Sequence, residues 1–105
     1  MNWKTEEIKK LIQAVLLLEN EKEVKTFLRD LMTEPEIQEF AKRLQAADML
    51  NQNISYSVIE KQIGLSSTTI ARVAKWLKGK EGGYKNILNK LHHHSHGHQS
   101  GRRLS

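Results

Sequence analysis

Apolar residues in the first half of the chain recur every three or four positions, which places them on one face of an α-helix. The first helix is predicted over residues 8–18. Two later positions carry a polar residue followed three residues on by glutamate, the pattern of a helix N-cap with its acidic partner: Asn20 with Glu23, and Thr33 with Glu36. They predict a second helix that ends near Leu31 and a third that ends near residues 51–53.

The second half predicts two helices joined by a tight turn, followed by one more short helix. Ser55 can cap the first helix of the pair, Gly64 can take the left-handed conformation that ends it, and Ser66 or its neighbour can cap the next. The helical spacing then continues to Leu77. Three glycines interrupt it before a last short helix over residues 84–91. Because no segment alternates with the two-residue period of a strand, we expect an all-α fold.

The basic residues gather in the second half of the chain. Residues 1–54 hold eight Lys and Arg against ten Asp and Glu, whereas residues 55–105 hold nine against two. The second half therefore supplies all of the net charge of +5. Such a surface favours binding of polyanions, although a lysine-rich surface that only faces water has the same composition.

The composition also limits the compartment and the class of protein. The chain has no cysteine, so disulfide and thiolate chemistry are excluded and a reducing compartment suits it. The apolar run over residues 14–18 is too short to span a membrane, and we expect a cytoplasmic protein. Its ordered part is expected to be one domain over residues 1–91, with a modest core that a second subunit would help to complete.

Residues 55–78 carry the pattern of a helix-turn-helix, in which a short helix, a turn at Gly64 and a longer helix pack at a steep angle. On the second helix, Thr68, Arg72 and Lys75 share one side, opposite the apolar face. Hydroxyls at the N-terminal end can meet base edges and phosphates, and the longer cations can reach the DNA backbone. The candidate DNA-binding residues are Ser66, Ser67, Thr68, Thr69, Ala71, Arg72, Lys75 and Lys78.

The last segment, residues 92–105, is expected to be a disordered tail because it has almost no apolar residue to bury. All five histidines lie in it, so binding of transition metals has to be considered. A tight site needs fixed geometry and supporting hydrogen bonds, which a tail containing glycine and serine does not supply. We therefore expect no metal site, and a tail that senses metal remains the weaker alternative. The same placement of the histidines leaves no base held beside a nucleophile, so an enzyme is not expected.

Two stretches resemble the Trp repressor family, in particular its YerC/YecD-type branch: LRDLMTEPEIQEFAKRLQAADML and ISYSVIEKQIGLSSTTIARVAKWLKG. The resemblance runs from about Leu28 to Leu91. It implies an all-helical, intertwined homodimer whose two helix-turn-helix units read successive major grooves of double-stranded DNA. It also implies a regulator of transcription in bacteria, expected to be a repressor, that is associated with the nucleoid in the cytoplasm.

The Trp repressor holds tryptophan between two arginines of different subunits, and the resemblance locates the corresponding positions in this chain. Arg43 and Arg72 fall on the arginine positions and Thr33 on a pocket threonine. Val73 and Trp76 fall on the positions of a glycine and a serine that leave room for the ligand. They would collide with a free indole, so we expect no cofactor and no L-tryptophan corepressor. Trp76 either fills the vacated pocket, stacked on Arg72 and the partner subunit's Arg43, or is a partly buried aromatic on the helix flank.

The main alternative to DNA binding is a helical, dimeric protein-interaction module. In that case a groove of the dimer binds a partner helix, and the basic face has no role. The salt dependence of binding distinguishes the two functions. Binding to DNA through several phosphates weakens steeply as the salt concentration rises, whereas binding of a helix in an apolar groove should barely change.

Overall fold

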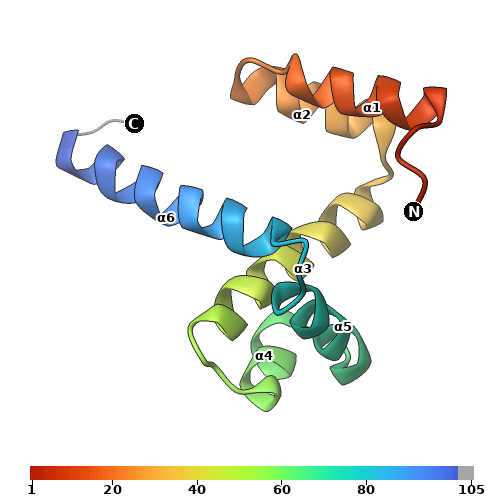
Figure 1. Cartoon of the computed structure of the whole chain (residues 1–105). Coiled ribbons are helices and arrows are strands. Elements are labelled where there is room, and N and C mark those ends of the chain that lie inside the picture. Colours follow the sequence, from red (N-terminus) through yellow and green to blue (C-terminus); the bar gives the residue numbers. More distant parts are fainter. Residues whose placement is uncertain (102–105) are drawn as a thin grey trace. The chain divides into compact units, whose positions relative to one another are not determined.

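The computed structural model describes the backbone of residues 1–101 and the side chains of residues 1–93. Within residues 1–101 the chain forms helices and turns without a strand, so the all-α expectation is confirmed (Figure 1). In chain order the helices are α1 (Glu6–Leu16), α2 (Glu21–Leu31), α3 (Glu34–Asn51), α4 (Tyr56–Ile63), α5 (Ser67–Leu77) and α6 (Gly83–Gly101).

The chain divides into two compact units, Met1–Ile37 and Gln38–Ser105, with the boundary near the start of α3. The single domain predicted over residues 1–91 stays a prediction. In the first unit, neither α1 nor α2 has a buried residue.

In the first unit, the predicted N-caps start the helices. The Asn20 side chain accepts a hydrogen bond from the Glu23 backbone N–H at 2.9 Å, and Glu23 accepts one from the Glu19 N–H at 3.0 Å. Thr33 and Glu36 form the same reciprocal pair at the start of α3, with the Thr33 N–H 2.8 Å from Glu36 Oε1. These hydrogen bonds stabilise the carboxylate and hold the pKa of Glu36 below its ordinary value of 4.5.

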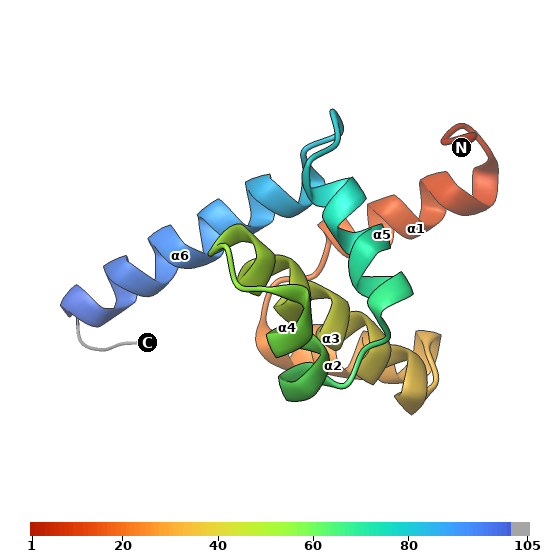
Figure 2. The ribbon, with the colours of Figure 1, turned by 90° about the horizontal axis from the view of Figure 1, so that it is seen from below.

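In the second unit, the helix-turn-helix forms as predicted. Ser55 caps α4 through the Val58 N–H, and Ser66 caps α5 through the Thr69 N–H at 3.2 Å. Gly64 ends α4 with φ of 83°, in the left-handed region. Figures 1 and 2 show α4 and α5 grouped around the C-terminal half of α3.

The core of the second unit consists of two clusters that both include α3. In the first, Ala46 and Met49 of α3 pack with α4, the turn and α5. In the second, Ala47 packs with the other part of α5 and with α6. The first cluster is completed by Ile59, Leu65 and Ile70, and the second by Val73, Leu77 and Leu88. Together the two clusters hold one side of α5 against α3 and leave the opposite side of α5 exposed to solvent.

The last helix is longer than the sequence predicted. α6 continues to Gly101, whereas a disordered tail was expected from residue 92, and residues 102–105 lie outside the described part. Leu88 anchors α6 in the core. One turn further along, His92 Nε2 lies 2.9 Å from Asp48 Oδ1 of α3. A helix that is already formed extends at a lower cost than it is nucleated.

We predict that Gly64→Ala lowers the free energy of unfolding by about 1 kcal/mol, measured by urea denaturation with circular dichroism. The added methyl meets nothing within 4 Å, so the cost arises from the positive φ alone. Gly83→Ala is the matched control, because its surroundings are equally open and its φ is not positive. Equal effects of the two substitutions would contradict a strained turn at Gly64.

Candidate nucleic-acid interface

One side of α5 is buried and the other is exposed over its whole length. The buried side is formed by Ile70, Val73, Ala74 and Leu77. We call the exposed side the α5 stripe, and it consists of Ser67, Thr68, Ala71, Arg72 and Lys75. The helical spacing of the sequence predicted this division. The predicted residue Lys78 is also exposed, directly after the helix.

Hydroxyl groups at the start of α5 fall into two pairs with different roles. Ser66 Oγ accepts from the Thr69 N–H and also lies 3.1 Å from Thr69 Oγ1, so both side chains are used in capping the helix. Ser67 and Thr68 form no side-chain hydrogen bond within the described residues. Of the four predicted hydroxyls, these two are free to bind a ligand, whereas the other two hold the helix end in shape.

The cations of the α5 stripe are not paired within the chain. The salt bridges among the described residues lie on α1, α2 and α3 and between α3 and α6. None of them involves Arg72, Lys75 or Lys78, so each of these charges faces solvent. An unpaired cation keeps its full attraction for a phosphate, since no carboxylate has to be displaced first.

Beside the α5 stripe, a hollow of about 90 Å³ separates α3, α5 and α6. It is lined by Arg43, Thr69, Arg72, Val73, Trp76 and Tyr84. Sequence reasoning missed Tyr84, which comes from α6 after the glycine turn, where no local signal indicates a return to α5. We call this hollow the arginine hollow.

Comparison with known proteins places this geometry in a family. The sequence matches the family described as Trp repressor protein over residues 6–92. It is 35% identical over 85 residues to the uncharacterized protein YerC of Bacillus subtilis strain 168, covering 81% of this chain and 82% of that protein.

The chain belongs to the Trp repressor family. Its resemblance to YerC places it in the YerC-type branch. The crystal structure of a TrpR-like protein from Eubacterium eligens ATCC 27750 matches with a TM-score of 0.79 at 33% identity, over 85% of this chain and 92% of that one. A candidate Trp repressor from Staphylococcus aureus matches with a TM-score of 0.81 at 36% identity, over 88% and 95%.

Of the five pocket positions that the Trp repressor resemblance indicated, four line the arginine hollow: Arg43, Arg72, Val73 and Trp76. The fifth, Thr33, belongs to the first unit, where its backbone and side chain bond to Glu36 at the start of α3. Thr33 thus has a capping role that the pattern of the sequence also indicated.

The expected stacking of Trp76 involves an arginine of a second subunit, so it stays a prediction. In a single chain the indole of Trp76 is 54% exposed and lines the arginine hollow. The Arg43 guanidinium lies 3.3 Å from Glu39 Oε2 and 5.3 Å from the centre of the Phe40 ring. Arg43 is therefore held by its own helix, and no stacking of Trp76 on an arginine occurs among the described residues.

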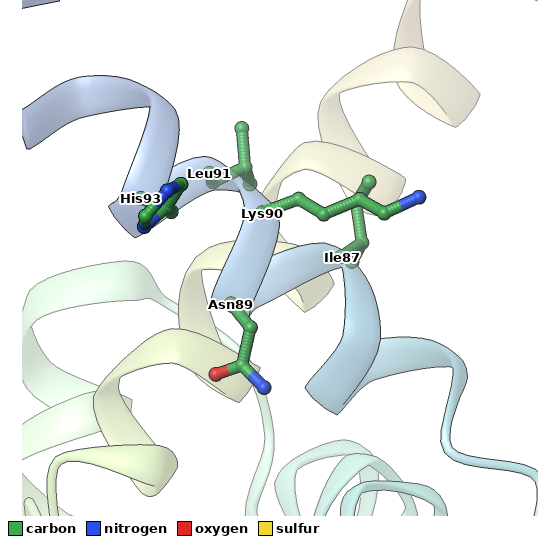
Figure 3. Close-up of a pocket in the computed structure, with 5 residues that line it drawn as sticks. All are labelled: Ile87, Asn89, Lys90, Leu91 and His93. Carbon is green, nitrogen blue, oxygen red and sulfur yellow. The ribbon is translucent and has the colours of Figure 1, made fainter. Parts of the chain in front are cut away.

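A larger and more open hollow, about 690 Å³, lies along α6. Figure 3 shows its five lining side chains, all from α6: Ile87, Asn89, Lys90, Leu91 and His93. Because all five side chains come from one helix, their polar groups do not converge on a common point as they do in a ligand site. Within residues 1–93 no three His, Asp or Glu side chains come together as a metal site, and no described helix is long and apolar enough to cross a membrane.

We predict that Ser66→Ala lowers the free energy of unfolding by about 1 kcal/mol in urea denaturation, because α5 loses its N-cap. Ser67→Ala is the matched control. It removes the neighbouring hydroxyl, which forms no hydrogen bond in the described part of the chain, and should change stability by less than about 0.5 kcal/mol. A larger loss for Ser67→Ala than for Ser66→Ala would reverse the assignment of the two roles.

Proposed function

We propose that this protein is a DNA-binding regulator of transcription that binds double-stranded DNA through the α5 stripe and acts as a repressor. The observation that carries the proposal is the row of exposed hydroxyl and cationic side chains along one side of a helix whose other side is fixed in the core. A helix of this kind can enter the major groove with its N-terminal residues toward the bases. The place of action would be the nucleoid in the cytoplasm.

Within the α5 stripe the side chains divide into reading and anchoring groups. Ser67 and Thr68 are short, unpaired and next to the positive end of the helix dipole, so they can meet base edges or nearby phosphates. Arg72 and Lys75 stand one and two turns further along, and their length suits contacts with the DNA backbone. Serine and threonine accept several base edges, so the operator sequence does not follow from them.

We propose that the DNA-binding species is a homodimer. Neither α1 nor α2 has a buried residue, and several apolar side chains on these helices and directly after α1 are exposed: Leu11, Ile12, Val15, Leu16, Leu17, Val24 and Leu31. Exposed apolar surface on this scale marks an interaction site. A second copy of the chain provides the same surface in return, as a two-fold interface requires. Two copies would also place two α5 stripes on successive turns of DNA.

We further propose that DNA binding needs no L-tryptophan. The arginine hollow of about 90 Å³ falls well below the roughly 300 Å³ at which small-molecule sites begin. Val73 and Trp76 occupy space that a ligand would need. Glu39 already engages the Arg43 guanidinium that would have to meet a ligand carboxylate. Both space and charge thus disfavour an amino acid at this place.

The deciding experiment is a titration of DNA fragments from the promoters of the source genome at two salt concentrations, with wild type and Arg72→Ala. We expect wild-type affinity to fall steeply as salt rises, because cations on DNA are released. Arg72→Ala should weaken binding and reduce the slope of log K against log salt by about 1. Lys42→Ala, which removes an exposed charge from α3 outside the α5 stripe, is the matched control and should leave both unchanged.

The same titration is repeated with L-tryptophan, which should alter neither affinity nor slope. A tryptophan-dependent affinity would refute the ligand-independent part of the proposal. Absence of DNA binding even at low salt would refute DNA binding itself. It would favour the protein-interaction alternative, for which the exposed apolar surface of Ile87 and Leu91 on α6 is available.

We predict that Ile12→Asp shifts the protein from dimer to monomer in sedimentation velocity at micromolar concentration. Ile12 lies on the apolar side of α1, and a carboxylate there would be desolvated in an interface without a partner. Gln13→Asp places the same charge one residue further along the helix and should leave the dimer intact. A dimer unaffected by Ile12→Asp would exclude this side of α1 from the interface.

A further inference from the structure

The N-terminal half of the α5 stripe carries only short side chains. Ser67, Thr68 and Ala71 are all exposed. Spacings of three and four residues place Ala71 beside the other two on the surface of the helix. The long cations Arg72 and Lys75 lie further toward the C-terminal end. Short side chains at the leading end of a helix let its backbone approach the floor of the major groove, where the base edges are exposed.

Ala71 has no role in the core of the second unit. It directly follows the buried Ile70, yet it belongs to neither of the two core clusters. Its side chain is a single methyl group, which forms no hydrogen bond and carries no charge. Alanine favours the helical conformation, so helix propensity alone is the competing explanation for this residue. The two explanations differ in whether the methyl group contacts a partner.

The composition of α5 limits the bases that it can read. Asparagine and glutamine pair with adenine, and aspartate and glutamate accept a hydrogen bond from cytosine. None of these four residue types occurs over Ser67–Leu77. Arginine and lysine, which pair with guanine, occur only from Arg72 onward, where the proposed function assigns them to the DNA backbone. Hydroxyl groups bind several base edges, so the selective groups at the leading end are the methyl groups of Thr68 and Ala71.

Thymine presents a methyl group in the major groove, at C5, and alanine and threonine side chains can contact it. Such a contact removes apolar surface of both molecules from water. We propose that the α5 stripe recognises thymine through the methyl groups of Ala71 and Thr68. The inference rests on the proposed function and deepens it by naming the base that these side chains select.

The test starts from a pool of random DNA duplexes, from which the full-length protein selects its tightest binders at low salt. In the selected duplex each thymine is replaced in turn by uracil, which keeps every hydrogen-bonding group and lacks only the C5 methyl. We expect uracil to weaken binding about fourfold at the contacted thymines, which corresponds to one methyl group left in water.

Two substitutions remove the methyl groups from the protein side. Ala71→Gly deletes one, and Thr68→Ser deletes the other while it keeps the hydroxyl. Each should reduce the uracil effect at its own thymine to less than about twofold, as expected for two groups in contact. Because the readout is a ratio of two affinities of the same variant, the lower stability of a helix with glycine cancels.

Lys75→Ala is the matched control within the α5 stripe. It should weaken binding of the thymine and uracil duplexes equally and leave the fourfold ratio unchanged, because its proposed contact is with the DNA backbone.

Equal binding of the thymine and uracil duplexes at every position would overturn the thymine contact and leave DNA binding intact. A uracil effect that persists in both Ala71→Gly and Thr68→Ser would also overturn it, because the effect would then arise from the deformability of the DNA. Failure to select any duplex at low salt would refute DNA binding and this inference with it.

Discussion

The close approach of three helices to two consecutive alanines of α3 underlies the arrangement of the second unit. Ala46 and Ala47 are both fully buried, and neighbouring residues on a helix point about 100° apart. Ala46 therefore contributes to the cluster with α4 and α5, and Ala47 to the cluster with α5 and α6. A larger side chain at either position would push a helix outward, because packed interiors tolerate added volume poorly. The small methyl groups let α4, α5 and α6 all pack closely against α3.

The orientation of α5 follows from this arrangement, and the candidate interface follows from α5. Ile70 enters one cluster, whereas Val73 and Leu77 enter the other, so rotation of the helix would disrupt both. The α5 stripe therefore faces away from the core, and its direction is set by the buried residues on the other side of the helix. The arginine hollow lies where α5 meets the neighbouring helices, and Trp76 and Tyr84 line it from α5 and α6.

The elements that the sequence predicted well are those determined by neighbours along the chain. The caps at Asn20, Ser55 and Ser66, and the left-handed end of α4 at Gly64, depend on side chains within four residues, and all of them formed. The buried side of α5 followed from its spacing. The place of Asn53, which has φ of 66° between α3 and α4, was indicated only as part of a turn.

What the sequence could not predict depends on contacts between distant residues. His92 meets Asp48 across 44 positions, so the extension of α6 had no local signal. Tyr84 reaches the arginine hollow from α6, so its place there could be seen only in the folded chain. The resemblance to the Trp repressor family identified Arg43, Arg72, Val73 and Trp76 as neighbours before any geometry was known. It could not indicate that Glu39 holds Arg43 or that Trp76 is half-exposed, because both depend on side-chain positions that a sequence pattern does not determine.

The lack of buried side chains in α1 and α2 also determines how the parts of one chain differ in hydrogen exchange. Their backbone amides are protected by helical hydrogen bonds alone, so local opening exposes them to solvent at little cost. The amides near Ile70 and Val73 exchange only when the core clusters separate. Within one chain, the amides of the core around α5 therefore exchange slowly and those of α1 and α2 exchange rapidly. A partner that covers α1 and α2 would slow their exchange toward the rate of the core.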